Sequence, residues 1–170
     1  MESKVLLKAA TSNDLERLVS ISKLTFVETF ADSNSQTDMQ NYLENDLSRE
    51  KLAAELADGN SKFYFAMLND SVIGYLKLNF GLSQTELKDD NAFEIERIYV
   101  LREFLGKEVG KLLYDKAIEV AEKADADYVW LGVWEKNSRA IRFYQKNGFV
   151  EFEKHIFRLG SDEQTDIMMK

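Results

Sequence analysis

The chain has 170 residues, of which 45% are hydrophobic and 31% are charged, and its formal net charge is −8. This length and balance predict one globular domain over residues 1–170, with a buried core. Such an acidic chain is a poor candidate for nucleic-acid binding, which needs a cationic surface. The sequence contains no cysteine and one histidine. This composition excludes disulfides and thiolate ligands, and it argues against a catalytic triad or a multi-histidine metal site.

The N-terminal region carries neither a long apolar run nor a signal-peptide pattern, so we expect an intracellular, cytoplasmic protein without membrane contact. The negative charge would suit a cationic substrate, which an acidic cleft attracts. Charge that serves only solubility is the commoner explanation of such a composition.

The first third of the chain predicts one strand followed by helices. Lys4–Ala10 is short and apolar, as a strand requires. Thr11 and Asp14 form a capping-box pattern, and apolar residues then recur along one helical face. Thr37 with Gln40 repeats the capping pattern and predicts a second helix, which a third helical piece follows.

The middle of the chain predicts a β-hairpin. Phe63–Leu68 and Val72–Phe80 are strand-like and are separated by Asn69-Asp70-Ser71, which is typical of a turn. Gly74 suggests a bulge within the second of these strands. Gly81–Asn91 is polar and acidic, so we expect an exposed loop there.

The second half alternates strand, helix and strand. Phe93–Val100 and Tyr128–Val133 are strand-like, and a crossover helix between two strands forces them to be parallel. The apolar stripe of this helix consists of Val109, Leu112, Leu113, Ala117, Val120, Ala121 and Ala124. A short helix capped by Asn137 and ending at Gly148 comes next. Two closing strands follow, Val150–Arg158 and Gln164–Met169. The predicted fold class is therefore α/β with a mixed sheet.

A glycine-bearing turn leads from the strand at Phe93–Val100 into the crossover helix. Its residues are Gly106, Lys107, Glu108, Val109, Gly110 and Lys111. A helix N-terminus offers unpaired N–H groups, glycines allow close backbone approach and lysines add charge, so the turn could hold a pyrophosphate. A tight turn that needs glycine only for packing is the alternative, and it is favoured if the pattern stands alone.

Three stretches together resemble the GNAT (Gcn5-related N-acetyltransferase) superfamily, over nearly the whole chain. Glu94–Val100 resembles the family's fourth strand, Leu105–Lys111 its acetyl-CoA pyrophosphate loop, and Asn137–Phe149 its helix that ends in glycine and phenylalanine. The resemblance is strongest to spermidine/spermine N-acetyltransferases of the bacterial Pai type, on EIERIYV, TFVETF, VWLGVWEKNSRAIRFYQKNGF and DEQTDIMMK. It implies a mostly antiparallel sheet in which a central parallel pair splays apart between flanking helices.

The resemblance also implies residue roles, with acetyl-CoA as co-substrate. Tyr144 would protonate the departing CoA thiolate, since a phenol with an unperturbed pKa of about 10 keeps its proton at neutral pH; an ordinary core aromatic is the alternative. Glu94 or Glu96 would take a proton from the amine, and a surface carboxylate or an ion pair with Arg97 is the alternative for each. The cofactor would contact the turn Gly106–Lys111 and Ile98, Tyr99, Val100, Asn137, Ala140 and Tyr144.

The turn departs from the family pattern at two positions. Leu105 replaces a polar residue, and Glu108 replaces a glycine. A carboxylate beside a pyrophosphate weakens its binding, unless the side chain points away or pairs with Lys107 or Lys111. The backbone N–H groups of the turn remain available in either case.

The acceptor site is less clearly marked. Trp134 could wall a substrate channel and attract an alkylammonium by cation–π interaction, whereas Trp130 is better explained as core. Glu28 lies in the helical region that closes over the acceptor in the family. It could hold a polyamine nitrogen, although a solvated helix-face charge is the commoner explanation. His155 receives no role.

The main hypothesis is direct transfer of acetyl from acetyl-CoA to a primary amine such as spermidine or spermine, without a metal ion. The first alternative changes the acceptor to a protein N-terminus, an amino acid or an antibiotic. The second is a non-catalytic acyl-CoA-binding regulatory module. The resemblance also allows a homodimer, because dimers are common in the family.

Overall fold

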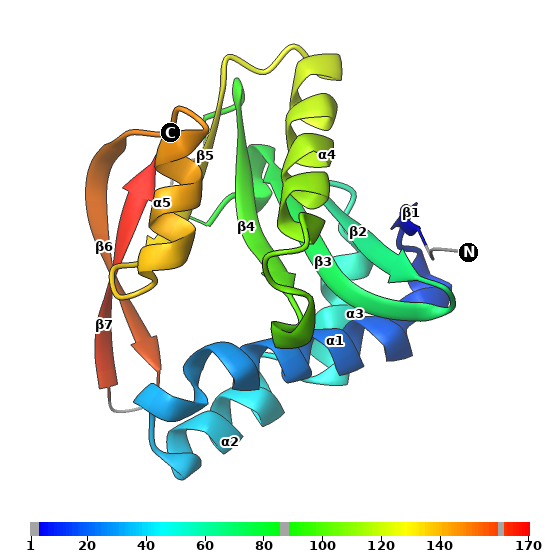
Figure 1. The fold of residues 1–170 in the computed structure, drawn as a ribbon, viewed down its shortest axis with the longest axis vertical. Helices are drawn as coiled ribbons and strands as arrows, with labels where there is room; N and C mark the ends of the chain where they lie inside the picture. Colours follow the sequence, from blue (N-terminus) through cyan, green and yellow to red (C-terminus); the bar gives the residue numbers. More distant parts are fainter. Residues whose placement is uncertain (1–3, 86–88, 160–161) are drawn as a thin grey trace.

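The computed structural model describes residues 4–85, 89–159 and 162–170. They form a seven-stranded sheet in the order β1-β2-β3-β4-β5-β7-β6, with α4 and α5 in front of it and α3 behind in Figure 1. The strands are β1 (Val5–Ala9), β2 (Ser61–Leu68), β3 (Ser71–Phe80), β4 (Ala92–Val100), β5 (Tyr128–Trp134), β6 (Glu151–Leu159) and β7 (Asp162–Met169). The α-helices are α1 (Leu15–Phe30), α2 (Gln36–Asn45), α3 (Arg49–Ala57), α4 (Val109–Lys123) and α5 (Ser138–Lys146). Short 3-10 turns are η1 (Ser12–Asp14), η2 (Ala31–Ser33), η3 (Gly81–Ser83) and η4 (Arg102–Phe104).

The predicted parallel pair is β4 and β5, and every other neighbouring pair among the described strands is antiparallel. The two parallel strands pair only from Ala92 to Ile95 of β4 and from Tyr128 to Leu131 of β5. Beyond these residues both strands continue but no longer bond to each other. The α/β fold class and the mostly antiparallel sheet with a splayed central pair are therefore confirmed.

A β-bulge in β4 lies where the two strands part. Lys77 of β3 pairs with Arg97, but the next residue of β3 pairs with Ile95, so Glu96 is an extra residue. A bulge bends its strand and increases its twist, which turns the second half of β4 away from β5. The gap between the strands thus begins at the residue that the bulge inserts.

The bulge also decides which face the side chains of β4 take. Strict alternation would place Glu94 and Glu96 on the face of Ile98 and Val100 unless a bulge intervenes. In the structure Ile98 and Val100 pack against the core beneath α4. Glu94 and Glu96 point to the opposite face, where Glu96 joins a polar cluster that includes Glu55 of α3. The extra residue shifts the alternation by one, which separates the carboxylates from the apolar pair.

Two large apolar cores cover the two faces of the sheet, and a smaller third cluster surrounds Trp130. The core beneath α4 and α5 includes most of the predicted stripe: Val109, Leu113, Ala117, Val120 and Ala121 are buried. Leu112 and Ala124 were wrongly assigned to that stripe, since both are exposed. The core on the other face is built mainly from α1, α3 and β2. No helix among the described residues is long and apolar enough to span a bilayer.

Local capping explains where the N-terminal helices begin. The capping box of Thr11 and Asp14 is present as predicted, although it opens η1 directly before α1. The capping pattern at Thr37 and Gln40 was wrong. Ser35 caps α2 instead, because its hydroxyl accepts a hydrogen bond from the backbone N–H of Asp38 at 3.1 Å.

The expectation of an exposed loop at Gly81–Asn91 was partly wrong. Its residues 86–88 lie outside the described part, but Gln84 is buried. The Gln84 amide oxygen accepts a hydrogen bond from the indole N–H of Trp130 at 2.7 Å. The loop therefore folds back onto β5, and it carries Thr85 towards Glu94 at 2.8 Å from the backbone nitrogen to the carboxylate.

The predicted bulge near Gly74 is confirmed. Ala66 pairs with Gly74 and Met67 with Val72, so Ile73 is the unpaired residue beside the glycine. A Cβ at position 74 would lie 2.8 Å from the backbone oxygen of Tyr99 in β4. Glycine is needed there because β3 and β4 approach too closely for any side chain.

Candidate active site

A cleft of about 940 Å³ passes through the gap between β4 and β5, with lining residues from both faces of the sheet. It brings together most of the predicted site residues: Glu28, Glu94, Glu96, Ile98, Tyr99, Val100, Gly106, Glu108, Gly110, Lys111, Trp134, Asn137, Ala140 and Tyr144. Lys107 and Val109 are not among its lining residues. The side chain of Val109 is buried in the core, so only its backbone could serve the cleft.

The exposed edge of β4 presents peptide groups to this cleft. The N–H of Leu101 donates to the carbonyl of Ile73 in β3 at 2.9 Å. Because successive residues of a strand direct their peptide groups to opposite sides, Tyr99 also faces β3, whereas Ile98 and Val100 face the gap. Two residues of β4 thus offer N–H donors and C=O acceptors where β5 no longer pairs.

The glycine-bearing turn lies at the end of the cleft beside α4. Gly106 and Glu108 both have left-handed backbone conformations, with φ of +80° and +66°. Such a conformation favours glycine, the residue that Glu108 replaces. Lys111 forms an ion pair with Asp115 at 2.5 Å, and the Lys107 ammonium lies over the ring of Phe104. Neither lysine pairs with Glu108, whose carboxylate has no hydrogen bond or ion pair within the described residues.

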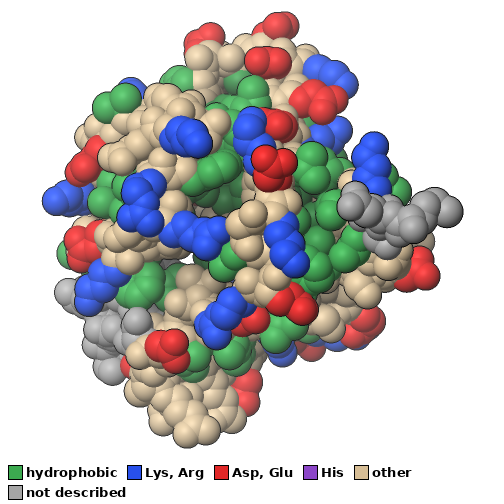
Figure 2. All heavy atoms as spheres, viewed as in Figure 1, with side chains coloured by type: hydrophobic (Ala, Val, Ile, Leu, Met, Phe, Trp, Pro, Cys, Tyr) green, Lys and Arg blue, Asp and Glu red, His purple; other side chains and the backbone are tan. Residues whose placement is uncertain are grey.

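Cationic side chains gather around this end of the cleft. Figure 2 shows lysine and arginine side chains grouped over the middle of the face that carries α4 and α5. Those that line the cleft at this end are Lys111, Arg139 and Lys146, whereas the guanidinium of Arg102 donates a hydrogen bond to the backbone carbonyl of Glu28 in α1 at 2.7 Å. A guanidinium nitrogen of Arg139 would lie only 3.3 Å from a Cβ at Gly106, so α5 brings a cation directly to the turn. The sequence analysis missed Arg139, because only the fold places α5 against this turn.

Tyr144 lines the same space from α5. The helix is capped as predicted, since the side-chain oxygen of Asn137 accepts a hydrogen bond from the N–H of Ala140 at 3.2 Å. The ring of Tyr144 packs between Phe143 and Phe149. Burial raises the pKa of the phenol above its usual range, so the hydroxyl keeps its proton at neutral pH.

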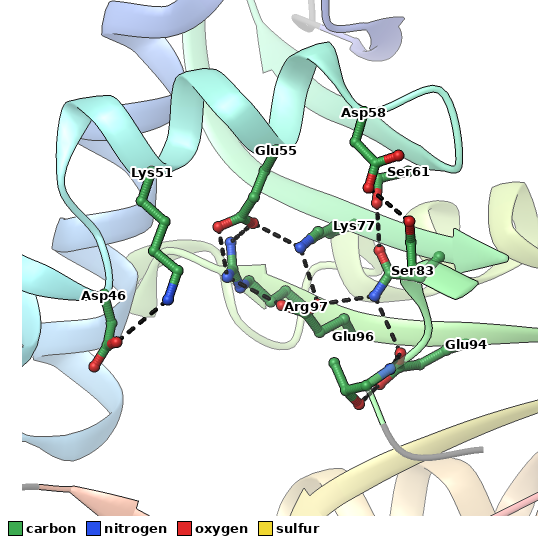
Figure 3. Close-up of polar contacts among 12 residues, drawn as sticks. Asp46, Lys51, Glu55, Asp58, Ser61, Lys77, Ser83, Glu94, Glu96 and Arg97 are labelled. Carbon is green, nitrogen blue, oxygen red and sulfur yellow. Dashed lines mark hydrogen bonds and ion pairs between the residues drawn. The ribbon is translucent and has the colours of Figure 1, made fainter. Parts of the chain in front are cut away.

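Glu94 and Glu96 belong to a buried polar network that extends from β4 to α3 (Figure 3). Glu96 accepts hydrogen bonds from Lys77 at 2.9 Å and Asn79 at 2.8 Å and pairs with Arg97 at 3.0 Å. Burial alone would raise the pKa of Glu96, but the charges of Arg97 and Lys77 outweigh it and lower that pKa. The carboxylate of Glu96 is therefore firmly held in its ionised form.

Glu94 is buried in a less charged setting. Its carboxylate accepts hydrogen bonds from the Thr85 backbone at 2.8 Å, the Thr85 hydroxyl at 2.5 Å and the Asn79 amide at 3.1 Å. Burial raises the pKa of Glu94, and these hydrogen bonds only partly oppose the shift. All three donors reach Glu94 from β3 and the loop after it.

The family model of the acetyltransferase (GNAT) family matches residues 16–149 of the chain. The chain belongs to the GNAT family. An uncharacterised N-acetyltransferase of Lactobacillus delbrueckii subsp. lactis is 41% identical over 94% of this chain and 92% of that protein. A spermidine N(1)-acetyltransferase of Thermoplasma acidophilum is 28% identical over 80% of this chain and 82% of that protein.

Solved structures agree with this GNAT assignment at the level of the fold. The PaiA N-acetyltransferase of Thermoplasma acidophilum, crystallised in complex with coenzyme A, superposes with a TM-score of 0.81. It is 24% identical and covers 98% of either chain. The resemblance to the GNAT superfamily, stated from the sequence motifs, is thereby confirmed, and the PaiA protein shares the fold of this chain.

The opposite end of the GNAT cleft is aromatic. Phe26 of α1 stacks on Tyr42 of α2 with ring centroids 4.2 Å apart, and Phe30 packs on Trp134 at 5.3 Å. Glu28 reaches the rim of the cleft, but its carboxylate accepts a hydrogen bond from the backbone N–H of Arg102 at 2.9 Å. Glu28 thus ties α1 to the segment after β4. Trp130 is fully buried, as expected for a core residue.

One lining residue at this end was missed by sequence reasoning. Asp166 of β7 lies opposite Trp134 of β5 and His155 of β6. Burial raises the pKa of its carboxyl to about 6, and His155 opposes the shift only in part. Asp166 lies in the stretch DEQTDIMMK, but the sequence does not indicate that it is buried, because a single aspartate in a strand is usually solvated.

The buried network predicts a large effect of removing Lys77. The substitution Lys77→Met would leave Glu55 and Glu96 without the ammonium that bridges them at 2.6 and 2.9 Å. Removing one partner from a buried ion pair leaves charge uncompensated, so we expect a loss of about 3 kcal/mol in the free energy of unfolding. Urea unfolding followed by circular dichroism measures it.

The matched control is Lys123→Met on the exposed face of α4, whose ion pair with Glu119 lies in solvent. Water screens that pair, so the unfolding midpoint should hardly move. Equal effects of the two substitutions would contradict a structural role for the network.

Proposed function

We propose that this GNAT acetyltransferase transfers acetyl from acetyl-CoA to a primary amine, with a polyamine such as spermidine or spermine as the acceptor. The observation that carries the proposal is the cleft through the gap between β4 and β5. It joins a cationic end, a peptide edge and an aromatic, acidic end in one space. A relative named as a spermidine N(1)-acetyltransferase and a similar fold crystallised with coenzyme A support the choice.

The residues of the cationic end suit acetyl-CoA. When bound, acetyl-CoA would supply an activated acetyl group. The peptide groups of Ile98 and Val100 can bond an extended amide-bearing arm as a further strand would, because no strand occupies that side of β4. The turn Gly106–Lys111 offers backbone N–H groups at the start of α4, and Arg139 adds a cation for a pyrophosphate.

Tyr144 is the proposed general acid. Its raised pKa keeps the phenol protonated throughout the neutral range, so a proton is available for the sulfur that leaves. The phenol lines the cleft from α5 on the same face as Ile98 and Val100. The proton donor and the peptide edge therefore lie on the same side of the sheet.

The aromatic end suits an amine that is positively charged in water. The rings of Phe30 and Trp134 can attract an alkylammonium by cation–π interaction. Several carboxylates line this part of the cleft, and Glu28 stands at its rim. A polyamine with several ammonium groups gains from more than one of these contacts, whereas a monoamine gains from one.

The assignment is tested by incubating the protein with acetyl-CoA and a panel of amines while the release of free thiol is measured. We expect spermidine and spermine to give the highest kcat/KM, above butylamine, amino acids, a dipeptide and an aminoglycoside. Turnover of another amine with spermidine inert would remove the polyamine assignment. Tight binding of CoA without turnover of any amine would indicate a regulatory module instead.

In the same assay, Tyr144→Phe should lower kcat by about 100-fold, because the phenyl ring cannot give a proton to sulfur. Its Kd for CoA, measured by calorimetry, should stay unchanged. Tyr64→Phe is the matched control, since Tyr64 of β2 packs outside the cleft. An unchanged kcat in Tyr144→Phe would eliminate Tyr144 as the acid.

Glu108 provides a prediction about coenzyme affinity. Glu108→Gly removes a carboxylate from the turn and relieves a left-handed conformation that costs a non-glycine residue about 1 kcal/mol. We expect tighter CoA binding, by about fivefold or ~1 kcal/mol, and a higher stability in urea. Glu108→Gln separates the causes, because it should improve the affinity without the gain in stability. Weaker CoA binding by both variants would show that the carboxylate does not oppose the phosphates.

A further inference from the structure

Asp166 stands beside the gap between β4 and β5. It pairs with Trp134, three residues beyond Leu131, where β5 last pairs with β4. Its carboxylate lies next to Gly132 of β5, since a Cβ added to that glycine would lie 3.7 Å from Oδ2 of Asp166. The absence of a side chain at Gly132 therefore opens the space beside this carboxylate to the cleft.

Tyr99 of β4 is near enough to this carboxylate to be influenced by its charge. Burial raises the pKa of the Tyr99 phenol well above its usual range, and the negative charge of Asp166 adds to the shift. Asp166 thus belongs to the face that carries Tyr99 and Trp134, opposite to the face of Tyr144.

Among the carboxylates that line the interior of the cleft, Asp166 differs in its partners. Glu96 is held by Lys77, Arg97 and Asn79. Glu94 accepts three hydrogen bonds from Thr85 and Asn79. The carboxylate of Asp166 has no hydrogen bond or ion pair within residues 4–85, 89–159 and 162–170. Its lone pairs remain available to a ligand, and a proton acceptor needs such availability.

The charged surroundings of Asp166 suit a proton acceptor. The titratable groups that act on it are His155 of β6 and Tyr99 of β4. The neighbouring strand β5 presents Gly132 and Trp134, which do not ionise. With its pKa raised to about 6, the carboxylate is ionised at neutral pH yet holds a proton more tightly than an ordinary aspartate.

We propose that Asp166 receives the ammonium group of the acceptor amine and takes up its first proton, a step that rests on the amine acetylation proposed above. The N–H bond breaks, the electron pair stays on nitrogen, and the proton binds an oxygen of Asp166. Asp166 then releases this proton to water in the cleft. As the N–C bond forms and the C–S bond breaks, sulfur takes the proton of Tyr144, and the second amine proton restores the phenol.

The experiment compares kcat/KM for spermidine between pH 5 and 8 in the wild type, Asp166→Asn, Glu94→Gln and Glu96→Gln. We expect wild-type activity to fall as the pH drops through about 6, because a protonated carboxyl cannot accept a proton. Asp166→Asn should lose about 100-fold in kcat/KM and lose this acidic limb, with its Kd for CoA unchanged.

Both glutamine variants should keep the acidic limb, even where their activity falls. Asp70→Asn, in the exposed turn between β2 and β3, is the matched control and should behave as the wild type. An acidic limb that persists in Asp166→Asn, or that disappears in Glu94→Gln or Glu96→Gln, overturns the assignment. An unchanged Kd for CoA shows that a variant is folded.

A binding measurement separates this inference from the proposed function. If the protein acetylates no amine, the proposed amine acetylation is wrong. Whether Asp166 binds an ammonium group is then decided by a carbon NMR titration of its labelled carboxyl in the CoA complex. The signal is identified by its loss in Asp166→Asn. Spermidine should lower the pKa of this carboxyl, because a bound ammonium favours the carboxylate. A carboxyl indifferent to spermidine would exclude Asp166 as the ammonium site.

Discussion

The β-bulge at Glu96 is the constraint on which the cleft depends. The extra residue ends the pairing of β4 with β5 and turns the following side chains to new faces. A buried network fixes it: Lys77 bridges Glu55 of α3 and Glu96, and Arg97 pairs with both glutamates (Figure 3). Burying these charges costs free energy unless every partner is in place, so the network favours one geometry of the bulge over near alternatives. The ion-pair network thereby holds the bulge in place and keeps the gap between β4 and β5 open.

The distribution of charge in the cleft separates two kinds of ligand. The chain carries a net charge of −8, yet arginine and lysine side chains surround the end of the cleft beside α4. The other end contains aromatic rings and Asp166. In water at physiological salt the electrostatic field of a charged side chain decays within about 8 Å. Each end of the cleft therefore acts mainly on the ligand groups that bind there. This distribution supports the proposed placement of polyphosphate at one face of the sheet and ammonium groups at the other.

Local rules explain which parts of this fold the sequence predicted. The crossover through α4 requires parallel β4 and β5, and the caps at Thr11 and Asn137 depend on residues within four positions of each other. The features that the sequence did not predict depend on contacts between residues distant in sequence. Gln84 is buried because Trp130, 46 residues away, needs an acceptor, and the skip in register at Glu96 is set by pairing with β3.

Some residues of the candidate site could likewise be predicted from local motifs, and others could not. The residues of the turn and of α5 follow from motifs, and the fold brings them to one end of the cleft. Arg139 and Asp166 also lie in stretches that carry the resemblance, but those stretches do not show what the two side chains face. Their places beside the turn and beside Gly132 follow only from contacts with other elements. The order of the last strands hides Asp166 further, because β7 inserts between β5 and β6 instead of closing the edge. That insertion places the aspartate beside the gap.

A cleft that crosses the sheet also favours direct transfer as the proposed chemistry. Tyr144 lies on the face of α4 and α5, and Asp166 lies on the opposite face, with the peptide edge of β4 between them. The nucleophile loses its first proton to Asp166 on one face, and the leaving group gains a proton from Tyr144 on the other, so these two steps use different residues. Each group can then hold a pKa suited to its own half of the reaction, raised above neutrality for the phenol and near 6 for the carboxyl. The gap is the place where the two halves meet, so the amine nitrogen can attack the carbonyl carbon directly and the sulfur can then leave, without a covalent acyl-enzyme.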